Sequence, residues 1–184
     1  MENVFHMAML WEKVVVTARE FLTEVKINDC AELNEPFFQA KLMEFDWDLS
    51  FAAACIFAEI VWKKALMGRG TNEMRQLDRL FGPSPIATHA NFRGCRAFKT
   101  GNAPQKGAIV VWKRGNSWQG HMAIVTDVSE DMQNFDTIEG RILIGSGPFF
   151  LQVEERKGKQ IGLPFRSDKL NIVGFIYPPD QEIR

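Results

Sequence analysis

The sequence predicts an α+β fold in which N-terminal helices pack on a C-terminal antiparallel sheet of about five or six strands. In the first half of the 184 residues, apolar side chains recur three and four positions apart, which is typical of helices. Short apolar runs between turn residues fill the second half, which is typical of strands. No repeat or linker separates the halves, so residues 1–184 are expected to form a single domain.

Three helices are expected before residue 67. The apolar spacing of residues 9–25 predicts an amphipathic helix. Residues 34–36, Asn-Glu-Pro, are expected to form the cap and first turn of a short second helix that continues to Phe45, because proline is tolerated in a first helical turn. Residues 52–66 are apolar nearly all round, so this third helix should be central and buried.

The middle of the chain has a weaker pattern. Residues 72–81, NEMRQLDRLF, predict another short helix. Residues 82–94 predict a loop with about one helical turn, because Pro83 and Pro85 interrupt it. The strands are expected after this loop, as an antiparallel meander over residues 107–112, 121–128, 136–140, 149–156 and 170–178.

The charge and cysteine content exclude several classes of function. A formal net charge of −1 favours neither nucleic acid nor an anionic membrane as partner. Three scattered cysteines predict free thiols rather than a disulfide framework, and neither a metal site nor another cofactor is indicated. No apolar run is long enough for membrane insertion. One basic cluster is expected to be solvated surface: Arg93, Arg96, Lys99, Lys106, Lys113 and Arg114.

The first residues, MENVFHMAMLWEKVVV, do not resemble a signal peptide, because the apolar run is short and no small-residue cleavage site follows. We therefore expect synthesis in the cytoplasm. Any action outside it would require release or delivery by another route.

Three residue types in the chain could form a nucleophilic site. His121 begins a predicted strand, where the sheet holds it at an edge that substrate can reach. Glu139 lies about one hairpin later, and a carboxylate beside an imidazole fixes its tautomer and stabilises the imidazolium. Cys55 lies near the start of the central helix, where the helix dipole and a nearby imidazolium would favour the thiolate.

The segment around His121 resembles the CHAP amidohydrolases, which are papain-like peptidoglycan hydrolases of phages and bacteria. In that family a Pro-x-x-Gly segment with a following Trp leads to Gly-His and an apolar strand, and then to Thr-Ile-Glu-Gly. The matching residues here are Pro104, Gly107, Trp112, Gly120, His121, Ile124, Val125, Thr137, Ile138, Glu139 and Gly140. The GFIYP segment near the end is also similar, whereas the resemblance before residue 50 is looser.

The resemblance implies a single papain-like catalytic domain, with no separate wall-binding domain and no cofactor. Its substrate would be peptidoglycan, cleaved as an N-acetylmuramoyl-L-alanine amidase or an endopeptidase through a Cys-His-Glu thioester mechanism. A phage lysin released by a holin, or a bacterial effector with a cognate immunity protein, would fit, and we expect a monomer. The alternatives are an inactive module that binds wall fragments or a partner protein, and a cysteine peptidase that acts on protein.

The family spacing does not place the nucleophile at the cysteine. Counting forward from Trp47 and backward from Trp62 both lead to Ala54, where the family has Cys. Ala54 is thus the expected nucleophile position and Cys55 the alternative, since neighbouring helical residues differ by about 100° in direction. Three explanations remain open: an engineered Cys-to-Ala variant, a one-residue shift that makes Cys55 the nucleophile, or a naturally inactive homologue.

Three further residues are candidates for substrate binding. Trp118 and Gln119 directly precede His121 and are expected to line the groove. Arg141 occupies a position where the family often has Asn. Its guanidinium cannot accept a hydrogen bond, so orientation of the histidine would depend on Glu139 alone.

Overall fold

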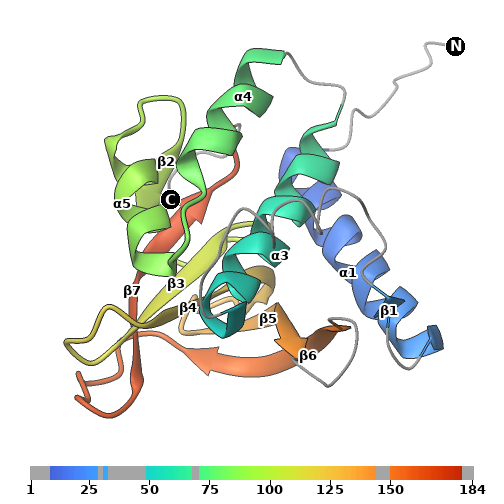
Figure 1. Cartoon of the computed structure of the whole chain (residues 1–184). Coiled ribbons are helices and arrows are strands. Elements are labelled where there is room, and N and C mark those ends of the chain that lie inside the picture. Colours follow the sequence, from blue (N-terminus) through green and yellow to red (C-terminus); the bar gives the residue numbers. More distant parts are fainter. Residues whose placement is uncertain (1–8, 29–30, 33–48, 68–70, 144–149, 180–184) are drawn as a thin grey trace, which may run out of the picture.

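Three of the four helices of the described chain pack against a seven-stranded antiparallel sheet, and the fourth packs on two of these helices (Figure 1). The structure is a computed structural model, and it describes residues 9–28, 31–32, 49–67, 71–143 and 150–179. The α+β class expected from the sequence is confirmed. The expected short helix over residues 34–45 lies outside the described residues, as do the tryptophan at position 47 and the first of the three cysteines.

The helices follow the apolar pattern of the sequence closely. Helix α1 spans Leu10–Asn28, α3 spans Leu49–Leu66, α4 spans Thr71–Leu80 and α5 spans Pro85–Gly94. From residue 54 onward, α3 is buried along almost its whole length, because it packs on α1 and on the central strands. The prediction of a central buried helix is confirmed.

Aromatic packing fixes the C-terminal half of α3. The Trp62 indole stacks on Phe98 and meets the edges of Phe81 and Phe92 at centroid distances of 5.8 to 6.4 Å. These rings come from α5 and the segments beside it, so the helical layer is tied together around one side chain. Rigid packing of this kind positions the N-terminal half of α3 against the sheet.

Helix α5 corrects the prediction of a loop with about one turn. Ser84 caps this helix, and its hydroxyl accepts a hydrogen bond from the Ala87 backbone N–H at 3.2 Å. Pro85 is the first helical residue, where its missing N–H has no partner to lose. The proline therefore begins the helix and does not interrupt it.

The sheet order is β1-β6-β5-β4-β3-β7-β2, and every neighbouring pair is antiparallel. Strands β3 to β6 form the expected meander. The last strand departs from it, because β7 crosses over to pair with β3 on one side and β2 on the other. The strands are β1 (Ala31–Glu32), β2 (Lys99–Gly101), β3 (Ile109–Arg114), β4 (Gly120–Val128), β5 (Asn134–Leu143), β6 (Phe150–Gln160) and β7 (Leu170–Tyr177).

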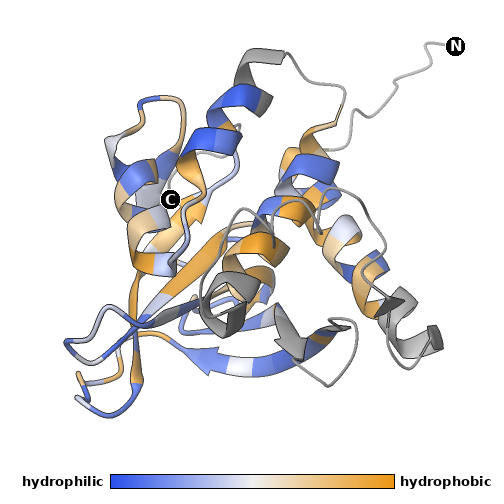
Figure 2. Cartoon of the chain, viewed as in Figure 1, coloured by the Kyte–Doolittle hydropathy of each residue, from blue (hydrophilic) through white to orange (hydrophobic). Residues whose placement is uncertain are grey.

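Successive residues of the central strands enter two separate apolar clusters. Ile124 and Ile138 face the helices and join the main core. Trp112 and Phe135 belong to a second cluster on the opposite face. The central strands are accordingly among the most apolar parts of the chain, whereas much of β6 is hydrophilic (Figure 2). Much of the middle of the sheet is thus buried on both faces.

Candidate active site

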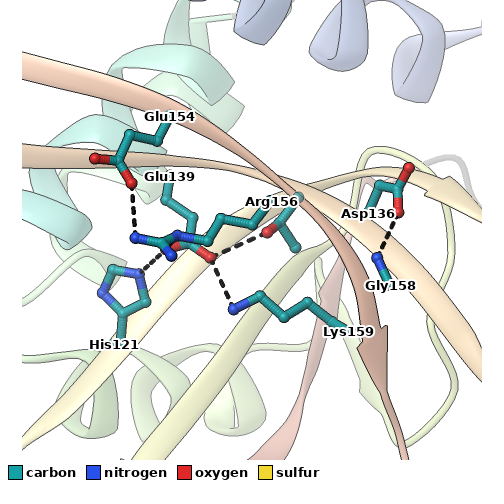
Figure 3. Close-up of polar contacts among 8 residues, drawn as sticks. His121, Asp136, Glu139, Glu154, Arg156, Gly158 and Lys159 are labelled. Atoms are coloured by element: carbon teal, nitrogen blue, oxygen red, sulfur yellow. Dashed lines mark hydrogen bonds and ion pairs between the residues drawn. The ribbon is translucent and has the colours of Figure 1, made fainter.

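His121 and Glu139 form a direct pair on neighbouring strands (Figure 3). The His121 Nε2 atom lies 3.0 Å from the Glu139 Oε2 atom. His121 is the second residue of β4, and Glu139 lies in the middle of β5. The two side chains expected from the sequence to lie together are therefore in hydrogen-bond contact.

Strand alternation explains why both side chains point to the same face. A Cβ atom at Gly140 would lie 2.3 Å from the Phe57 ring, so Gly140 faces α3 and Glu139 faces away from it. His121 pairs across the ladder with Trp112, which also faces away from α3. The Trp112 ring stacks on the imidazole at 5.7 Å with an interplanar angle of 24°, and this contact limits rotation of the histidine.

Glu139 is a buried carboxylate with four polar neighbours. Besides His121, its oxygens accept a hydrogen bond from the Thr137 hydroxyl at 3.1 Å and lie 3.4 Å from Lys159 Nζ and 3.6 Å from Arg156 Nε (Figure 3). Burial disfavours the charged form of this group. The hydrogen bond and charge of His121, with the contributions of Lys159 and Thr137, outweigh burial and lower the pKa of Glu139 to about 2.

Arg156 serves two carboxylates at once. Glu139 and Glu154 are direct cross-strand partners, an arrangement in which like charges repel. The Arg156 Nη2 atom lies 2.7 Å from Glu154, and its Nε atom faces Glu139. Arg156 and Lys159 were not identified from the sequence. The only signal was the alternation of charged residues along β6, since their registration with Glu139 depends on an irregularity in the β5–β6 ladder.

A cleft of about 1230 Å³ opens beside this pair. Its walls include His121 and Glu139 from the sheet, Ala54 from α3, and residues 160–166 and 169–174 around the loop between β6 and β7. Ala54 of α3 and the His121–Glu139 pair thus line one cavity, although the pair lies on the sheet face that points away from α3.

Ala54 and Cys55 differ sharply in their surroundings. Ala54 lines the cleft, whereas Cys55 is not among the described residues that do so. The Cys55 side chain is buried, and its Sγ atom lies 4.0 Å from the Thr88 hydroxyl on α5. Burial raises the pKa of this thiol to about 12, so it is protonated at neutral pH.

The start of α3 also bears on this position. The helix begins at Leu49 and not at residue 52 as expected, so position 54 lies in the second helical turn. Because the dipole effect falls off within the first turn, the helix end would contribute less to thiolate formation than expected. His121 would have to supply most of the activation.

The remaining predicted residues are placed unevenly. Gln119 lines the cleft. Trp118 is 58% exposed and is not one of the described residues that line it. The side chain of Arg141 lies outside the side chains that the structure describes.

Within the described ranges, no group of three or more His, Cys, Asp or Glu side chains could hold a metal ion. The same ranges contain no helix whose length and apolar character would let it cross a membrane.

Comparison with known protein families agrees with the fold class. The CHAP domain family matches residues 45–141, a segment that includes Ala54, His121 and Glu139. The chain belongs to this family, a family of hydrolases with amidase or peptidase activity on peptidoglycan. Searches among curated proteins and among solved structures gave no match.

Proposed function

We propose that this domain is the scaffold of a cysteine-dependent peptidoglycan amidohydrolase, with the nucleophile's place at Ala54 and with His121 and Glu139 as its partners. The observation that carries this proposal is that Ala54, His121 and Glu139 line one cleft. With alanine at position 54, the chain lacks the reacting thiol at that place. The proposal therefore concerns the chain with cysteine restored there.

The His121–Glu139 contact suggests how the proton would move. Because Nε2 is directed at the carboxylate, Nδ1 is the ring nitrogen left to accept the proton of a thiol at position 54. The thiolate would attack the carbonyl carbon of an amide bond and form a tetrahedral intermediate. Nδ1–H would then protonate the leaving amine, and the acyl group would remain on sulfur as a thioester.

Water would complete the cycle. His121 would accept a proton from water, the hydroxide would attack the thioester carbonyl, and the thiolate would leave as the carboxylic acid forms. Glu139 would hold the imidazole and stabilise the imidazolium in both steps. Arg156 and Lys159 would act as positioning residues, because their contacts favour an ionised and oriented Glu139 carboxylate.

The test is the Ala54→Cys variant on purified sacculi, followed by mass analysis of soluble fragments. We expect fragments from Ala54→Cys and none from the unmodified chain. The matched controls are Ala54→Ser, which has a poor nucleophile in the same place, and the double variant Ala54→Cys/His121→Ala. Both should release no fragments above background.

The same assay separates the alternative nucleophile. If the unmodified chain releases fragments and Cys55→Ser abolishes this release, Cys55 is the nucleophile and our assignment of position 54 is wrong. If Ala54→Cys is folded but inactive, the catalytic proposal fails. The masses would also distinguish cleavage between sugar and peptide from cleavage within the peptide.

One observation favours a second candidate function. Since alanine lines the cleft at the position where the family has cysteine, the unmodified chain could bind wall fragments without cleaving them. Pelleting of the unmodified chain with sacculi, together with an inactive Ala54→Cys variant, would support this binding role.

A further inference from the structure

The cleft is far more basic than the chain that contains it. The whole chain has a formal net charge of −1. Five cations line the cleft, whereas Glu139 is the one carboxylate among its described lining residues. Two further carboxylates, Glu154 and Asp168, pair with lining cations from outside the lining. Even when both are counted, five cations face three carboxylates. The cations that line the cleft are Arg114, Arg156, Lys159, Arg166 and Lys169.

These five cations fall into two groups. Arg156 and Lys159 contact Glu139, and Lys169 lies 3.8 Å from Asp168. Arg114 and Arg166 form no ion pair with any described residue, although both line the cleft. Two guanidinium groups are therefore left to meet a ligand.

The backbone that carries these two arginines is held in place. Arg114 ends β3 opposite Leu170, and the next residue, Gly115, donates its N–H to the Lys169 carbonyl at 3.1 Å. The Asn171 side chain accepts the Arg166 N–H at 2.8 Å and donates to the Arg166 carbonyl at 2.8 Å. The β3–β4 turn and the β6–β7 loop thus form one fixed corner, which reduces the entropy cost of binding.

Gly115 makes the contact between these two loops possible. Its φ of +49° lies in the left-handed region, and a Cβ atom there would lie 2.1 Å from the Ser167 carbonyl oxygen. Only glycine allows this approach. The corner is therefore a built feature of the chain and not a chance proximity of two surface loops.

Strand geometry gives the distance of this corner from the reacting histidine. Trp112 pairs with His121, and Arg114 lies two residues further along the same strand and on the same face. Two strand residues span about 7 Å, which is also the length of about two residues of an extended peptide. A peptide with its cleaved amide at His121 would present its second neighbour to Arg114.

Apolar side chains surround the same corner. Leu163, Phe165 and Leu170 line the cleft and are 65%, 59% and 42% exposed. A bound peptide would cover these groups, and the lower local dielectric would strengthen a contact between a carboxylate and a guanidinium. Arginine suits such a ligand because its planar fork matches both carboxylate oxygens.

We propose that this corner of the cleft is a subsite in which Arg114 and Arg166 bind a free carboxylate of an acidic peptide, about two residues from the cleaved amide. The inference rests on the function proposed above and adds the charge and spacing of the substrate. It would also give the cleft a preferred binding direction, since the remaining lining arginine among the described residues, Arg156, is paired with Glu139 and Glu154.

The test is co-sedimentation of the full unmodified chain with purified sacculi and with sacculi whose carboxyl groups have been converted to amides by carbodiimide and ammonia. We expect the chain to bind native sacculi about tenfold more tightly than amidated ones, as expected for charge-assisted hydrogen bonds in a partly enclosed site. Arg114→Gln/Arg166→Gln should bind both preparations equally and weakly, and each single variant should fall between.

The matched controls are Lys113→Gln and Lys157→Gln. Lys113 neighbours Arg114 on β3 but is not one of the lining residues, and Lys157 lies on β6 outside the lining. Each removes one positive charge, so a purely long-range charge effect would weaken binding as much as a single arginine substitution. We expect these controls to keep the preference for native sacculi.

Equal binding of native and amidated sacculi by the unmodified chain, or no effect of the arginine substitutions, would overturn the subsite. So would competition by 10 mM inorganic phosphate but not by a Glu-containing tetrapeptide, because the ligand would then be phosphate. Failure of the proposed function looks different: arginine-dependent binding would persist while Ala54→Cys released no fragments. If instead Ala54→Cys is active and both arginine substitutions leave its kcat/KM unchanged, only the subsite is wrong.

Discussion

The two faces of strands β4 and β5 have different roles, because one face packs in the core and the other carries the candidate site. On the face toward α3, Ile124, Ile138 and Gly140 pack against the helix. On the other face, His121 and Glu139 form the polar pair that opens into the cleft. The comparison shows that a site can be as well fixed as a core, because each polar residue has packed neighbours on both sides along its strand.

The largest effect is expected on the helix-facing side. Gly140→Ala would place a Cβ atom 2.3 Å from Cγ of Phe57, so α3 and β5 would have to separate. We expect the free energy of unfolding to fall by about 3 kcal/mol, as for other overpacked cores. Chemical denaturation would measure this. Gly94→Ala is the control, because a Cβ atom there meets nothing within 4 Å; an equal loss in both variants would contradict our account of this face.

The next effect tests the polar face through its pH dependence. Because the pKa of Glu139 is lowered to about 2 from its ordinary 4.5, its contribution to stability is present above pH 4.5 and is lost as the pH falls toward 2. Between pH 7 and pH 3 the loss should be roughly 2 kcal/mol, and Glu139→Gln should lack it. Urea unfolding at both pH values measures the difference. Equally steep losses in the two proteins would show that the carboxylate is not held as described.

A smaller effect is expected from the bridge between the two glutamates. Arg156→Gln leaves Glu139 directly opposite Glu154 without the shared cation, which should cost about 1 kcal/mol. In the double variant Arg156→Gln/Glu154→Gln the repulsion is gone, so part of the stability should return. A double-mutant cycle by thermal unfolding measures the coupling, and simple additivity would mean that Arg156 does not act as a bridge.

The smallest effect on activity is expected at Cys55, on the core side of α3. In the Ala54→Cys background, Cys55→Ala should leave fragment release within about twofold, because the buried thiol does not face the cleft. Alkylation of the native chain with iodoacetamide at pH 7.5, followed by peptide mapping, should modify Cys95 faster than Cys55. Rapid modification of Cys55 would contradict its protonated, buried state.

The features that could be predicted from the sequence are those that depend on residues close together along the chain. The apolar spacing located α1 and α3, and the strand motif located His121 and Glu139 on paired strands. The start of α5 was missed because a proline reads as a breaker unless the capping residue before it is recognised. Pairing of β7 with β3 was missed because no local feature encodes which distant strand lies beside it.

The positions of the site's cationic side chains could not be predicted from the sequence either, because they too depend on contacts between distant segments. Arg156 and Lys159 reach Glu139 only through the registration of β6, which includes an irregularity near Phe135. Arg114 was grouped with solvated surface charges, since its proximity to Arg166 arises from a contact between two loops about fifty residues apart. The net charge of the whole chain does not reveal where such contacts bring cations together.

The crossover of β7 affects the order in which the sheet can form during synthesis. Strand β3 in the middle of the sheet has no neighbour on its β2 side until Leu170–Tyr177 arrives, and β2 has no partner at all before then. During synthesis the meander β3 to β6 emerges first, with one edge of β3 open to pairing with any other chain. The corner that carries Arg114 and Arg166 also forms only at this last step, so a nascent chain stopped before β7 would have the histidine and glutamate but no finished cleft.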